Sequence, residues 1–259
     1  MTRALLALAL VAATFPARAE GPPDLAVDVR TTAAIAGGSL AIWGATELLK
    51  GEIAPSSCRW CEPPALDRRA RAQLAWSDPG AARLLSDVLV VALPASLAAG
   101  TVLAARDLRH GGEDVLVAVE AIALASLGTQ IVKLAVARRR PHAWALGTRA
   151  GPDDDLSFFS GHASAAFATA GAFGTVARLR GYRAWPVVYA AGFSTAAVIA
   201  YLRVAADKHW LSDVTAGAVF GTGVGIAVPL VLHRGQADRK LTVAPLPLGE
   251  VGLGISGAF

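Results

Sequence analysis

Six long apolar segments, separated by polar connections, dominate the chain. None of them alternates apolar with polar residues, which favours helices over strands. Each is long enough, or nearly so, to cross about 30 Å of hydrocarbon at about 1.5 Å per residue. All are rich in alanine and glycine, which let helices approach closely in lipid. The pattern therefore predicts an all-α fold, a six-helix transmembrane bundle. The segments span residues 31–49, 85–104, 114–136, 161–178, 184–203 and 210–232.

The two ends of the chain have a different pattern. Residues 1–19 have a basic start, an apolar core and a small-x-small site, which predicts a signal peptide; an uncleaved anchor is the alternative. A polar segment, 20–30, follows. In the tail, 233–259, Val251, Leu253 and Ile255 alternate with small residues, and Leu25, Val27 and Val29 alternate near the predicted mature start. Short β segments could form at both termini and pair with each other.

Composition supports a membrane environment. Of the 259 residues, 54% are hydrophobic and only 17% are charged, whereas soluble domains carry about 25% charged residues. The net charge is +4, but the basic residues lie in the connections between apolar segments rather than on one face with stacking aromatics. We therefore expect membrane lipids as partners and no nucleic acid.

Two cysteines, Cys58 and Cys61, lie in the long polar loop 50–84. The C-x-x-C spacing fits a redox pair, half of a zinc site or a small disulfide. Two further zinc ligands are missing nearby, and so is a βαβ context for a redox motif. A structural disulfide in an oxidising compartment is favoured over free thiols.

Cations at the ends of apolar segments are the first candidate chemistry, because a charge inside a bilayer is costly. Lys133 lies near the end of the third segment, and Arg140 follows in the loop before Pro141. Both side chains could converge on one anion, for which a guanidinium offers paired donors. Alternatively, Lys133 and Arg203, at the end of the fifth segment, extend to the interface as simple anchors.

A second cluster begins the fourth segment. Ser160 is a good N-cap, Gly161 lets a ligand approach the backbone, and His162 lies in the first turn. Helix N-termini bind phosphate well. By itself, however, this tripeptide is more often a helix start with an incidental histidine.

A third cluster pairs His209 with Asp213. The two are four residues apart, so they share one face of the sixth helix. The Asp213 carboxylate could accept a hydrogen bond from one imidazole nitrogen and leave the other free to attack. A plain helix-face pair would give the same spacing.

Together the three clusters resemble the type 2 phosphatidic acid phosphatase superfamily, which also includes the vanadium haloperoxidases. The family pattern is K-x6-R-P, then P-S-G-H, then S-R-x5-H-x3-D, and the resemblance covers residues 85–232. Two positions depart from it, because Phe159 replaces proline and Leu202 replaces serine. The matching positions are Lys133, Arg140, Pro141, Ser160, Gly161, His162, Arg203, His209 and Asp213.

The resemblance implies a metal-independent lipid phosphatase without a cofactor. Its mechanism would use Lys133, Arg140, Arg203 and the Ser160–His162 backbone to hold phosphate. His209, oriented by Asp213, would form a phosphohistidine while His162 protonates the leaving oxygen. No metal site is expected, and the acidic run 153–155 is interpreted as a solvated loop.

The substrate class implied is a phosphate monoester or pyrophosphate of a membrane lipid. A vanadate-dependent haloperoxidase and a non-enzymatic membrane protein with a degenerate site are the alternatives. We expect the protein in a bacterial-type cytoplasmic (inner) membrane. Its site is expected on the extracytoplasmic, periplasmic side, where the cysteine loop could be oxidised.

Overall fold

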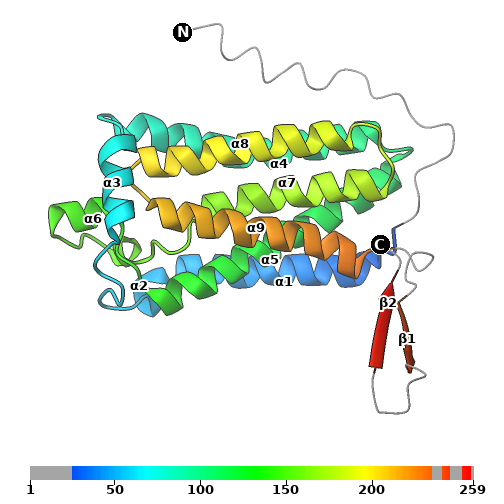
Figure 1. Ribbon diagram of the computed structural model, residues 1–259, viewed down its shortest axis with the longest axis horizontal. Helices are drawn as coiled ribbons and strands as arrows, with labels where there is room; N and C mark the ends of the chain where they lie inside the picture. Colours follow the sequence, from blue (N-terminus) through cyan, green and yellow to red (C-terminus); the bar gives the residue numbers. More distant parts are fainter. Residues whose placement is uncertain (1–24, 235–240, 246–252, 258–259) are drawn as a thin grey trace, which may run out of the picture.

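Six long helices form the body of the protein in the computed structural model, which describes residues 25–234, 241–245 and 253–257 (Figure 1). They coincide with the six apolar segments, so the all-α prediction is confirmed. The long helices are α1 (Val29–Leu48), α4 (Pro79–Ala104), α5 (Leu108–Val136), α7 (Gly161–Leu179), α8 (Trp185–Ala205) and α9 (Leu211–Leu232).

Four of these helices are long and apolar enough to cross a membrane: α4, α5, α8 and α9. Their large apolar side chains are exposed where a soluble protein would carry polar groups; Val91 on α4 is 67% exposed and Val219 on α9 is 71% exposed. Such surfaces are stable against hydrocarbon. The chain is therefore an integral membrane protein. By length and composition, α1 and α7 do not qualify as spans among the described residues.

Helix α7 lies at the centre of the bundle and packs against α4, α5, α8 and α9, while α1 packs on α5. Most of α7 is buried, and its small residues explain the close packing. The glycines Gly217, Gly221 and Gly225, spaced four apart on α9, lie directly against the α7 backbone. Small residues at this spacing bring helix axes together in lipid.

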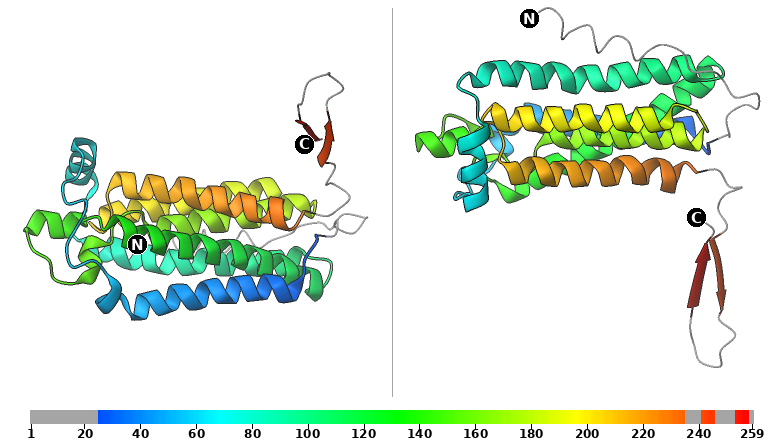
Figure 2. Two further views of the ribbon diagram at one scale, coloured as in Figure 1. Left: turned by 90° about the horizontal axis from the view of Figure 1, so that it is seen from below. Right: turned by 45° about the horizontal axis from the view of Figure 1, so that its top comes forward.

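Short helices gather at one end of the bundle (Figures 1 and 2). The long loops predicted between apolar segments in fact contain α2 (Lys50–Ile53), α3 (Ala65–Leu74), α6 (Pro141–Leu146) and the 3-10 helix η2 (Pro152–Asp155). They are too polar or too short to stand out as apolar segments. The start of α7 and α9 and the end of α5 and α8 lie at this same end.

The predicted pairing of the two termini is wrong. Val29 begins α1 instead of lying in a strand, and Asp28 caps that helix by accepting from the backbone N–H of Arg30 and Thr31. In the tail, β1 (Leu241–Pro245) pairs antiparallel with β2 (Leu253–Gly257). Each of these strands therefore has its pairing partner within the tail. The predicted signal peptide lies outside the described residues.

Candidate active site

The three sequence clusters meet where α5 and α8 end and α7 and α9 begin. The charges of Arg140, Arg203, Lys133 and His162 all act on the His209 imidazole. Lys133 also lies close to the start of α7, because a Cβ placed on Gly161 would be 3.5 Å from its Nζ. The bundle thus brings together three cations and two histidines that are up to 76 residues apart in sequence, from Lys133 to His209. We call this group of five side chains the cation cradle.

Arg140 is held by backbone carbonyl groups rather than by a carboxylate alone. Its Nε donates to the Asp153 carbonyl oxygen at 2.7 Å, and Nη1 and Nη2 donate to those of Lys208 at 3.1 Å and Leu156 at 3.3 Å. Pro141 follows as the first residue of α6 and keeps Arg140 extended. The guanidinium is therefore fixed in orientation and 6% exposed.

His209 has a defined tautomer. Its Nδ1 lies 2.9 Å from the Ser157 carbonyl oxygen, and since a carbonyl only accepts, Nδ1 carries the proton. Nε2 is consequently unprotonated in the neutral ring, and it lies 3.3 Å from Arg140 Nη1. Burial lowers the pKa of His209 well below its ordinary value, and the neighbouring Arg140, Arg203 and Lys133 lower it further.

Asp213 does not contact the imidazole as expected from the i, i+4 spacing. Its Oδ2 lies 3.6 Å from His209 Nδ1, beyond hydrogen-bond distance. The carboxylate instead accepts from Ser157 Oγ at 2.5 Å and from the Trp210 backbone N–H at 2.9 Å, which caps α9. The geometric reason is that the ring turns toward the Ser157 carbonyl, so Asp213 reaches His209 only through Ser157.

Arg138 and Asp67 complete this arrangement, and neither was identified from the sequence. Arg138 is 1% exposed and donates to Asp213 at 2.5 Å and to Asp67, on α3, at 2.6 Å. Its guanidinium lies 3.8 Å from the centre of the Trp60 ring, next to Cys61. Cys58 and Cys61 are joined by a disulfide. The cysteine loop and α3 are thus tied to the Asp213 carboxylate.

The interpretation of residues 153–155 as a solvated run is wrong for two of the three. Asp154 is 8% exposed and Asp155 is 0% exposed. Asp155 pairs with Arg139 and Arg149, and Asp154 with His142. Burial of these carboxylates is possible because each has a cationic or hydrogen-bonding partner.

Arg203 is held by two adjacent residues of α4. Its Nη1 donates to Ser86 Oγ at 3.0 Å and to Asp87 Oδ1 at 3.1 Å. The same Asp87 Oδ1 lies 2.8 Å from His162 Nε2. Asp87 was not predicted, because nothing in the spacing along the chain brings α4 to this site.

Ser160 is the N-cap of α7, and its Oγ accepts from the Ala163 backbone N–H at 3.4 Å. The first turn of α7 therefore points its N–H groups toward the same end of the bundle as Lys133. A helix N-terminus beside a lysine is electrostatically suited to an anion.

The family model of the PAP2 superfamily matches residues 114–236, which contain all of the motif residues. A transmembrane PAP2 type phosphatidylglycerolphosphate phosphatase from Bacillus subtilis, known from its crystal structure, is similar to this chain. It has 18% sequence identity over 77% of this chain and 90% of that chain, with a TM-score of 0.43. No curated protein matches the chain.

Two departures from the PAP2 motifs have local explanations. Leu202, in place of serine, is buried with Ala82 and Ala205 in an apolar cluster. The hydroxyl that contacts Arg203 comes instead from Ser86, on α4. Phe159, in place of proline, packs against Phe220 with ring centres 4.9 Å apart. Neither change removes a group from the cation cradle.

Proposed function

We propose that this PAP2 protein is a metal-independent phosphatase that hydrolyses phosphate monoesters or pyrophosphates of membrane lipids through a phosphohistidine. The observation that carries the proposal is the unprotonated Nε2 of His209, 3.3 Å from Arg140 in a cradle of fixed cations. A neutral imidazole with one unprotonated nitrogen is a nucleophile, and the cradle supplies the charge that a phosphate needs.

In the first step, His209 Nε2 attacks phosphorus as the bond to the leaving oxygen breaks. His162 gives that oxygen a proton. In the second step, a water molecule deprotonated by His162 attacks the phosphohistidine and releases phosphate. Lys133, Arg140, Arg203 and the N–H groups at the start of α7 stabilise the charge on the phosphate oxygens throughout.

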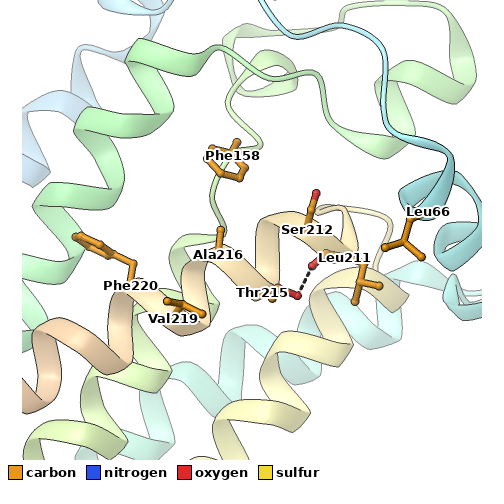
Figure 3. Close-up of a pocket in the computed structure, with 8 residues that line it drawn as sticks. All are labelled: Leu66, Phe158, Leu211, Ser212, Thr215, Ala216, Val219 and Phe220. Atoms are coloured by element: carbon orange, nitrogen blue, oxygen red, sulfur yellow. Dashed lines mark hydrogen bonds between the residues drawn. The ribbon is translucent and has the colours of Figure 1, made fainter.

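An open apolar groove beside the site supports a lipid substrate (Figure 3). It has a volume of about 670 Å³ and lies between α3 and α9. Phe158 lies next to Ser157, which accepts from His209, and Leu211 is two residues beyond His209. No residue of the cation cradle lines the groove, which adjoins the site through Phe158 and Leu211. Its lining residues are Leu66, Phe158, Leu211, Ser212, Thr215, Ala216, Val219 and Phe220.

The test is release of inorganic phosphate from phosphatidic acid by the purified protein in detergent, with and without EDTA. We expect turnover that is unchanged by EDTA and falls by at least about a thousandfold in His209→Ala, since loss of a nucleophile removes most of the catalysis. His110→Ala is the matched control, because His110 is paired with Asp107 at the other end of the bundle. Loss of turnover in EDTA, or unchanged turnover in His209→Ala, would contradict the proposal.

A further inference from the structure

Asp87 is a carboxylate inside a site whose other charged groups are suited to an anion. It lies on α4, outside the residues matched by the family model. Its side chain is 44% exposed. Oδ1 contacts both His162 Nε2, at 2.8 Å, and Arg203 Nη1, at 3.1 Å. These two partners come from α7 and α8, so one carboxylate links two motif residues on different helices.

A carboxylate in this place weakens phosphate binding, because it repels the substrate anion. We therefore expect Asp87 to have a function that compensates for this weaker phosphate binding. Burial, and after it the positive charges of Arg203 and Lys133, lower the pKa of His162 to about 4, which disfavours the protonated imidazole that a proton donor requires. A negative charge 2.8 Å from the ring opposes that effect.

The contact also fixes how the His162 ring faces the substrate. Since a carboxylate only accepts, Nε2 donates its proton to Asp87. Nδ1 is then the ring atom through which a proton can pass to the leaving oxygen. The second contact, to Arg203, holds the guanidinium beside the same histidine.

We propose that Asp87 is a positioning residue that orients His162 and stabilises the protonated ring of His162. Arg203 keeps its second contact, to Ser86 Oγ, when the carboxylate is removed. The proposal rests on the phosphatase function proposed above. As the bond between phosphorus and the leaving oxygen breaks, its electron pair stays on the oxygen, which takes the proton from His162 Nδ1. The neutral ring then accepts a proton from the attacking water, which restores the protonated state.

The test compares two substrates that differ in their need for a proton. Dodecyl phosphate releases an alcohol and needs the proton donor, whereas 4-nitrophenyl phosphate releases a phenolate that leaves without one. We expect Asp87→Asn to lower kcat/KM for dodecyl phosphate by at least about tenfold, and for 4-nitrophenyl phosphate by less than about threefold. Asp87→Glu, which keeps the charge, should recover part of the loss on dodecyl phosphate.

The matched control is Asp78→Asn, at the N-cap of the same helix. Asp78 caps α4 by accepting from the Gly80 backbone N–H, and asparagine caps about as well as aspartate. This variant removes one negative charge from α4 and should leave both rates near wild type. Equal losses on both substrates in Asp87→Asn, or none, would overturn the positioning role. Wild-type protein that releases phosphate from neither substrate would instead overturn the proposed function.

Discussion

His209 and Asp213 are connected by hydrogen bonds through Ser157, and this determines how each can act. The Ser157 carbonyl accepts the Nδ1 proton of His209, while the Ser157 hydroxyl donates to Asp213. The Asp213 charge is offset mainly by Arg138. Asp213 therefore positions the Ser157 segment and the start of α9, and the backbone carbonyl sets the tautomer of the imidazole.

The lowered pKa of His209 leads to a prediction about its protonation in the protein without substrate. Histidine ordinarily gains its second proton near pH 6.5. Burial and three neighbouring cations lower the pKa, so His209 should stay neutral as the pH falls through 6.5 and become protonated only well below it. We expect side-chain ¹⁵N NMR in micelles to show a neutral ring protonated on Nδ1 at pH 6.

The His209 resonances would be assigned by their loss in a His209→Gln sample. The urea-unfolded protein is the reference, and there the same ring should be largely protonated below pH 6.5. A doubly protonated His209 at pH 6 in the folded protein would contradict the tautomer and the electrostatic argument together.

At the scale of helices, the contact between α7 and α9 holds the site together, because α7 carries His162 and α9 carries Asp213. A Cβ on Gly221 would overlap the Ser164 carbonyl oxygen of α7. Backbone atoms cannot move aside as a flexible side chain can. By contrast, a Cβ on Gly223, two residues further along α9, would meet no atom within 4 Å.

Gly221→Ala and Gly223→Ala should therefore differ although they change the same helix by the same group. Overpacking costs about 1–3 kcal/mol, so Gly221→Ala should lower the temperature at which the protein unfolds in detergent by several degrees. It should also lower phosphatase activity by shifting α7 relative to α9. Gly223→Ala should be neutral or slightly stabilising, since alanine is the better helix former. Equal unfolding temperatures would refute the packing argument.

These elements also show what the sequence can predict. The six long helices follow from the length of the apolar segments, and the cradle follows from motif spacing, because each motif lies at a segment end. Helix α3 was missed because it is polar. The contacts of Asp67 and Asp87 were missed because they depend on how α3 and α4 pack, which no local pattern encodes. The i, i+4 rule failed for His209 and Asp213 because His209 precedes Trp210, the N-cap of α9, so the two residues do not share a helix face.

At the scale of the whole molecule, the helix directions separate two ends of the bundle (Figure 1). The site and the disulfide loop are at one end. At the other end are two short connections, the first between α4 and α5 and the second between α7 and α8. The second carries Arg180 and Arg183, directly after Arg178. Basic residues in short loops favour the cytoplasmic side.

The loops at the site end are also basic, so the prediction of an extracytoplasmic site rests on the basic α7–α8 connection together with the disulfide. The start of α1 would then lie on the cytoplasmic side, which agrees with the uncleaved alternative for residues 1–19 and not with a cleaved signal peptide. Single-cysteine variants Thr148→Cys and Arg183→Cys test it, because both positions are exposed and lie at opposite ends. The native cysteines are joined to each other and should not react. In intact bacterial cells whose outer membrane is permeabilised, a membrane-impermeant maleimide should label Thr148→Cys. Arg183→Cys should be labelled only after the inner membrane is lysed.

The unsubstituted chain, which should remain unlabelled in both conditions, is the control. The reverse labelling pattern would place the phosphatase site in the cytoplasm. The expectation that the disulfide lies in an oxidising compartment would then also be wrong.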